Sequence, residues 1–315
     1  MSYTVLAQSS VISQPLQMVI DSITTIDDIE LGFNNYGASK AHQWFQQLSD
    51  QSSIRQLETL TNYPDPRIRC YAFKAICYRK DPEAYNMFLK HLKDTIHVYI
   101  HDYDISYPQM VGDYMLRDLR PDSIQLHNIN NLLLNTDGIS LYARNDLLKN
   151  LNPLPQNYKR IRNIAVKERS EYAILALSRY QKHGDVDIIK TLFDKKDRSE
   201  FYGLYCVWQF PDSVFYPYLI KVFEKELISD YLNYPQCRML FIALAKYPVS
   251  QTTQLFEKAL LVQNDHLRKG FVQDIYIALI KSPDIYFAPV MTKLNLTPGD
   301  MDMAKLELNF EKYTY

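Results

Sequence analysis

Four side chains near the end of the first third of the chain have the chemistry of metal ligands or of acid–base groups. His97, His101, Asp102 and Asp104 all lie within the segment 95–108. Imidazoles and carboxylates are common ligands of Zn²⁺ and similar ions, and histidine exchanges protons near neutral pH. Because His97 and His101 are four residues apart, they share a face in a helix and in a strand alike. The spacing allows a metal-dependent or acid–base site, and equally a solvated surface that carries histidines.

The segment that holds these histidines has the pattern of a strand. Apolar Ile96, Val98 and Ile100 alternate with polar and aromatic residues, and a period of two is typical of a half-buried strand. We therefore expect a short β-hairpin or extended insertion near 95–108. The sequence has no HExxH motif, nucleophile elbow, phosphate loop or dinucleotide fingerprint to complete an active site, and it predicts no cofactor.

The rest of the chain is patterned for helices. A first helix is expected from Pro15 to about Ile29, and further helices over 54–60 and 111–119. The clearest unit spans 63–94, where a turn leads into a helix with one apolar face, a break follows, and a second apolar helix ends the unit. The residues that define it are Asp65-Pro66 at the turn, Ile68, Ala72, Ala75 and Ile76 on the apolar face, and Asp81-Pro82 at the break.

This unit resembles a HEAT repeat. The family pattern is Asp-Pro, an apolar-Arg pair, Ala-x-x-Ala with an apolar residue, then a turn and an apolar helix. Here it reads Asp65-Pro66, Ile68-Arg69, Ala72, Ala75-Ile76 and Leu89-x-x-Leu92. The resemblance, to bacterial HEAT-repeat proteins, implies an all-α fold: a right-handed α-solenoid of helix pairs whose first helices line a concave surface.

Fainter copies of the unit follow later in the chain. If Ala75, Ala176, Cys206, Ala243 and Ala278 are equivalent, their separations are 176−75 = 101, 206−176 = 30, 243−206 = 37 and 278−243 = 35. A period in the thirties with two helices per unit indicates an α-solenoid. We expect one solenoid domain over 13–315 with a degenerate middle at 95–155. A flexible tail over 1–12 would precede it, and a cap over 298–315 would close it.

Aligning the copies places tyrosines in columns along the first helices. One column holds Tyr71, Tyr172, Tyr202 and Met239, and the column three residues further on includes Lys74 and Tyr205. In a HEAT-like solenoid both columns would line the concave face. Tyrosine is favoured at interfaces because it combines large area, few rotors and a polar tip. The same tyrosines would also suit packing between repeats, so both readings stay open.

Composition narrows the function further. Lys and Arg number 35 against 36 Asp and Glu, which disfavours a general nucleic-acid binder. The same balance disfavours the alkylpurine DNA glycosylases, a HEAT-like enzyme class with a strongly basic concave face. No stretch is apolar enough to span a membrane. Residues 1–7 lack a complete signal peptide, so we expect a cytoplasmic protein, or a periplasmic or secreted one if they are the remnant of a trimmed signal.

The resulting prediction is a non-enzymatic scaffold that binds a protein partner on the concave face of a HEAT-like solenoid. The alternative is a metal-dependent or acid–base site at the His97–Asp104 insertion. The sequence identifies neither the partner nor the oligomeric state.

Overall fold

The computed structural model describes residues 12–30, 39–102, 104–194, 199–229, 233–299 and 301–302. These residues are mostly helical and include a small three-stranded sheet. The chain divides into two compact units, Met1–Leu147 and Leu148–Tyr315. The single solenoid domain over 13–315 stays a prediction. The predicted tail at 1–12 and cap at 298–315 lie mostly outside the described residues.

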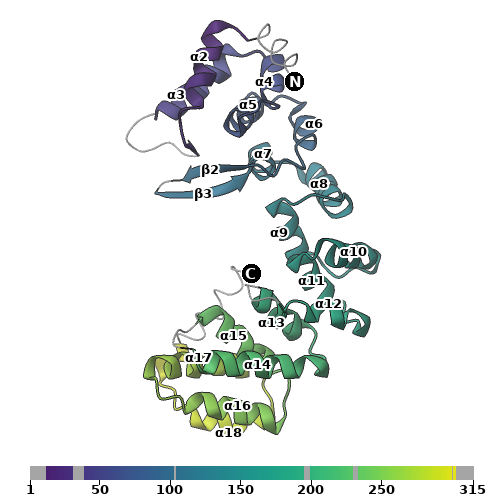
Figure 1. Ribbon diagram of the computed structural model, residues 1–315, viewed down its shortest axis with the longest axis vertical. Helices are drawn as coiled ribbons and strands as arrows, with labels where there is room; N and C mark the ends of the chain where they lie inside the picture. Colours follow the sequence, from purple (N-terminus) through teal and green to yellow (C-terminus); the bar gives the residue numbers. More distant parts are fainter. Residues whose placement is uncertain are drawn as a thin grey trace. The chain divides into compact units, whose positions relative to one another are not determined.

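The first unit contains a run of short helices and the sheet (Figure 1). Its helices are α2 (Gln14–Ile23), α3 (Lys40–Gln51), α4 (Ile54–Leu60), α5 (Pro66–Tyr78), α6 (Ala84–Leu89), α7 (Val111–Leu119) and α8 (Ser123–Asn135), and α9 (Tyr142–Asn150) crosses into the second unit. Helix α5 lies at the centre, because α2, α3, α4, α6 and α7 all pack against it.

Helix α5 is built as its sequence predicts. Asp65 caps it by accepting a hydrogen bond from the Arg67 backbone N–H at 2.9 Å, and Pro66 occupies the first turn, where no N–H is needed. The four apolar residues assigned to its core face, Ile68, Ala72, Ala75 and Ile76, are all fully buried. The two alanines let neighbouring helices approach closely.

Arg69 links α5 to both ends of the segment 63–94. Its guanidinium donates to the carbonyls of Tyr63 and Pro64, at 3.0 and 3.1 Å, and it pairs with Asp94 at 2.9 Å. His91 also lies 3.5 Å from the Asp94 carboxylate. The buried arginine therefore joins the turn before α5 to the chain that follows α6.

The expected hairpin forms within a three-stranded sheet. Strands β2 (His97–Asp102) and β3 (Ile105–Met110) pair antiparallel, and β1 (Asp28–Glu30) adds in parallel on the other side of β2. Val98 and Ile100 are buried whereas His97 and Tyr99 are exposed, as the period of two predicts. The sheet thus has one face against the helices and one face in solvent.

The prediction of a first helix to about Ile29 was wrong. Helix α2 ends at Ile23, and β1 begins five residues later. The hydroxyls of Thr24 and Thr25 donate to the carbonyls of Asp21 and Ser22, both at 2.7 Å. Such side-chain bonds compete with helix continuation, and β-branched residues propagate helices poorly.

The second unit consists of successive helix pairs. Its α-helices are α10 (Tyr158–Glu168), α11 (Glu171–Ser178), α12 (Val186–Lys190), α13 (Ser199–Gln209), α14 (Tyr216–Leu227), α15 (Tyr234–Leu244), α16 (Ser250–Leu260), α17 (Asp265–Lys281) and α18 (Ala288–Lys293). Short 3₁₀ turns η1 (Pro155–Asn157), η2 (His183–Asp185), η3 (Ser213–Phe215) and η4 (Ile285–Phe287) precede α10, α12, α14 and α18. Helices α11, α13, α15 and α17 pack against one another in chain order.

Two of the turns share a sequence motif, Pro-Asp-x-x-Phe-x-Pro. Its aspartates, Asp212 and Asp284, are 284−212 = 72 residues apart, which is two periods of 36. Each accepts a hydrogen bond at 3.0 Å from the backbone N–H two residues on. The motif phenylalanines, Phe215 and Phe287, are 0% and 1% exposed. The same turn therefore connects the helices of two separate pairs.

No helix in the described ranges is long and apolar enough to cross a membrane.

Candidate functional site

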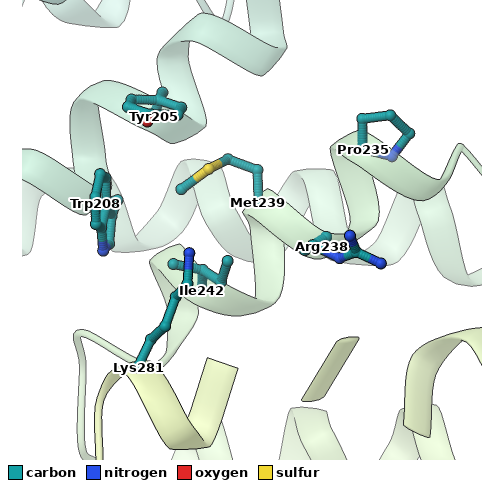
Figure 2. Close-up of a pocket in the computed structure, with 7 residues that line it drawn as sticks. All are labelled: Tyr205, Trp208, Pro235, Arg238, Met239, Ile242 and Lys281. Carbon is teal, nitrogen blue, oxygen red and sulfur yellow. The ribbon is translucent and has the colours of Figure 1, made fainter. Parts of the chain in front are cut away.

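A shallow pocket of about 20 Å³ opens on the second unit, between the first helices of three successive pairs (Figure 2). Helix α13 contributes two residues, α15 four and α17 one. The lining residues are Tyr205 and Trp208, then Pro235, Arg238, Met239 and Ile242, and finally Lys281. This volume is far below that of a small-molecule site, so the pocket suits a small apolar group at a protein contact.

Aromatic and apolar groups form the walls of the pocket. The rings of Tyr205 and Trp208 meet edge to face, with centroids 5.2 Å apart, and both side chains are partly exposed. Met239 and Ile242 are 6% and 2% exposed and belong to the buried core of the unit. Methionine is adaptable and the two rings are rigid, so the pocket combines a fixed wall with a deformable one.

Two cationic side chains border these walls. Arg238 is held by a charge-assisted hydrogen bond from its Nε to Asp274 of α17 at 2.9 Å, and Asp274 is only 1% exposed. Lys281 places its ammonium 5.9 Å from the Trp208 ring centroid. Figure 2 draws both side chains. The apolar surface of the pocket therefore lies beside Lys281 and the Arg238–Asp274 ion pair.

An aromatic strip extends from this pocket along the first helices. The rings of Tyr172 and Tyr202 meet at 5.2 Å, and the Tyr202 hydroxyl donates to the Tyr172 hydroxyl at 3.0 Å. Phe201 bridges to the pocket, since its ring lies 5.8 Å from Tyr202 and 6.4 Å from Tyr205. We call Tyr172, Phe201, Tyr202, Tyr205 and Trp208 the aromatic strip.

The structure brings together four of the six predicted ribbon residues. Tyr172 and Tyr202 form a pair, and Tyr205 and Met239 line one pocket. Three other pocket residues, Trp208, Arg238 and Lys281, were not predicted from the sequence. Trp208 follows Tyr205 by three residues and so lies on the same face of the helix. Extending the column by one helical turn would have predicted it.

The other two predicted ribbon residues lie in the first unit and have different surroundings. Tyr71 is 1% exposed, and its ring packs 6.0 Å from that of Phe45 on α3. Lys74 holds its ammonium 5.0 Å above the same Phe45 ring. Tyr71 thus contributes to packing rather than to an open surface, because α3 covers it.

The hairpin histidines share the solvent face of β2 but are far apart along it. Four residues of strand separate them, which is roughly 13 Å at about 3.3 Å per residue, too far for a shared ion. His97 lies edge-on to the Tyr142 ring at 6.4 Å. His101 has its Nδ1 3.0 Å from Ser106 Oγ, which donates to Asp28 Oδ2 at 2.5 Å.

The described residues hold no cluster of three or more His, Cys, Asp or Glu side chains able to bind a metal ion. Asp104 lies at the exposed tip of the hairpin, and Asp102 lies at the end of β2. Among the hairpin residues, His101 shares a surface row with Ser106 and Asp28, whose carboxylate contacts the serine and lies 4.0 Å from the histidine.

Comparison of the chain with protein-family models, with curated proteins and with solved structures found no match.

Proposed function

We propose that this protein is a non-enzymatic binding scaffold that captures a protein partner on the aromatic strip and the adjoining pocket. In this proposal the helix pairs of the second unit are HEAT-like repeats of an α-solenoid, and their first helices form its binding face. The partner would insert an apolar side chain between Tyr205, Trp208 and Met239. The compartment in which this occurs stays a prediction.

Side-chain contacts one repeat apart support the solenoid part of the proposal. Arg238 bonds to Asp274, and Tyr216 bonds to Thr252 at 2.9 Å, both across 36 residues. The Tyr202–Tyr172 hydrogen bond spans 30 residues. A solenoid makes such contacts because each repeat packs only on its neighbours.

One observation carries the binding part of the proposal: the strip leaves several large aromatic side chains partly exposed beside a shallow pocket. Tyr, Trp, Met and Arg are the residue types enriched at protein interfaces, and binding energy concentrates where they fill or line pockets. A strip needed only for packing would have its rings buried, as Tyr71 is.

A peptide-display selection tests this function. Immobilised full-length protein is presented with a random peptide library, and enriched peptides are re-tested against Tyr205→Ala and against Tyr78→Ala. Tyr78 is 76% exposed on α5 of the first unit, so it is a matched exposed tyrosine outside the strip. We expect enriched peptides with a large apolar residue, at least tenfold weaker binding to Tyr205→Ala, and unchanged binding to Tyr78→Ala. Peptides that bind both variants like the parent would refute the proposal.

A further inference from the structure

A basic groove lies on the second unit, outside the aromatic strip. It follows one face of α10, the helix that packs against α11 at the start of the helix pairs (Figure 1). Its volume is about 710 Å³, which is within the range of ligand-binding clefts. Eight residues of η1 and α10 line it, and none of them carries a carboxylate. Four of the eight are cationic, namely Lys159, Arg160, Arg162 and Lys167.

The helical period places the basic side chains on the outer face of α10. Lys159, Arg162 and Val166 recur at intervals of three and four residues, so they project from the same side. Residues of the opposite side, Ile161, Ile164 and Ala165, are buried. Packing on that side therefore fixes the helix with its basic face in solvent. Glu168 is the one acidic residue of α10, and it follows Val166 by two residues, which turns it away from this face.

The two lysines of the groove are not neutralised by the protein. Lys159 and Lys167 are exposed, and neither forms an ion pair within the part of the chain that the structure describes. The two arginines are already engaged. Arg162 donates from its Nε to the buried carboxylate of Asp185 at 2.9 Å, and Arg160 also has a partner. The positive charge available to a ligand is therefore that of the lysines.

A third ammonium lies beside the groove and covers its aromatic ring. Lys182 holds its Nζ 3.4 Å from the ring centroid of Tyr158 and has no ion pair among the described residues. Tyr180 meets the same ring edge to face at 5.2 Å, and the Tyr158 hydroxyl donates to Asp185 at 2.9 Å. Proteins that bind single-stranded nucleic acids offer free aromatic faces on which bases stack. Tyr158 is the only aromatic residue that lines the groove, so the groove offers little for stacking and favours a partner that contributes carboxylates.

We propose that the α10 groove binds an acidic, extended segment of a partner protein. Helix α10 has 11 residues and is about 16 Å long at about 1.5 Å per residue, which matches about five residues of extended chain. Carboxylates along such a segment would pair with Lys159, Lys167 and Lys182. Val166 is 50% exposed in the middle of the groove and would contact an aliphatic side chain between the carboxylates. This surface uses no residue of the aromatic strip.

Fluorescence anisotropy with a labelled acidic peptide tests this surface in the full-length protein. The probe is a fluorescein-labelled peptide of about six residues, with Glu and Asp around one central Leu. A peptide with Gln and Asn in place of Glu and Asp, and a thymidine oligonucleotide of the same charge, are titrated in parallel. We expect saturable binding of the acidic peptide that weakens as sodium chloride is raised, because salt screens exposed charges. The amide peptide should not bind.

A matched pair of double variants assigns the binding to the groove. Lys159→Gln with Lys167→Gln removes two charges from the groove, and Lys221→Gln with Lys258→Gln removes two charges from α14 and α16. All four lysines are exposed, so both proteins should keep the fold of the parent. We expect the groove variant to bind the acidic peptide about tenfold more weakly and the control variant to bind it like the parent.

Four results would overturn the proposal. They are no saturable binding of the acidic peptide, equal affinity of the two double variants, binding of the amide peptide as tight as that of the acidic one, and tighter binding of the oligonucleotide than of the acidic peptide.

Discussion

Replacing Arg69 with methionine should destabilise the first unit strongly, because this arginine holds both ends of the first helix pair. It is 7% exposed and contacts the Tyr63 and Pro64 carbonyls as well as Asp94. Methionine keeps most of the side-chain volume but makes none of these bonds. The change leaves a carboxylate and two carbonyls without their cationic partner.

The expected cost follows from this burial. Removing one partner of a buried ion pair costs about 3–5 kcal/mol. Asp94 would keep only His91 and the Ile96 N–H as partners. With an m value of about 2 kcal/mol/M, the urea midpoint should fall by about 1.5–2.5 M. The exposed pair of Lys90 with Glu58, 59% and 46% exposed, should contribute less than about 1 kcal/mol.

The assay uses the position of the two tryptophans. Trp44 lies on α3 of the first unit and Trp208 on α13 of the second. Replacing Trp208 with phenylalanine leaves Trp44 as the only tryptophan, so its emission reports unfolding of the first unit alone. Arg69→Met and the control Lys90→Met are compared in this background. Similar urea midpoints for the two variants would refute the role assigned to Arg69.

Three further predictions concern charge and packing. Burial raises the pKa of Asp94, but the His91 hydrogen bond and the Arg69 charge outweigh burial, so the pKa is lowered overall. The parent protein should therefore lose stability as pH falls below about 4, and Asp94→Asn should flatten that loss in an acid titration. Burial raises the pKa of Glu226, so the folded state prefers the neutral carboxyl and stability should fall as pH rises above about 5. Glu226→Gln should remove this decline. If the variant loses stability with pH as steeply as the parent, another group is responsible. Gly112→Ala should cost about 1–3 kcal/mol instead of giving the usual helical gain, because the new Cβ would lie 2.8 Å from the His91 carbonyl oxygen. Gly184→Ala, with nothing within 4 Å, should change the thermal midpoint little, and equal effects at both glycines would contradict the packing.

Local sequence patterns predicted most single elements. Helices α4 and α7 begin and end at the predicted residues, and the alternation at 96–100 predicted β2. These signals are local, because capping, turn chemistry and periodicity act within a few residues. Strand β1 was missed because it has three residues and forms only by pairing with β2, about seventy residues further on.

Alignment of the repeats predicted only part of the pocket. Aligned copies placed Tyr205 and Met239 on one face, and they line the pocket. Lys281 reaches it because α17 has 17 residues whereas α15 has 11, a difference that no repeat period predicts. Tyr71 occupies the same column as Tyr172 but is covered by α3. Aligning the repeats gives no information on such contacts between helices.

The most direct test of the scaffold proposal uses Trp208 as a reporter inside the pocket. With Trp44 replaced by phenylalanine, Trp208 is the only tryptophan, and a peptide from the display selection is titrated into the protein. We expect a saturable change in Trp208 emission that disappears when the peptide's large apolar residue is replaced by alanine. Saturable binding, measured independently by calorimetry, with no change in Trp208 emission would place the partner elsewhere and contradict the proposal.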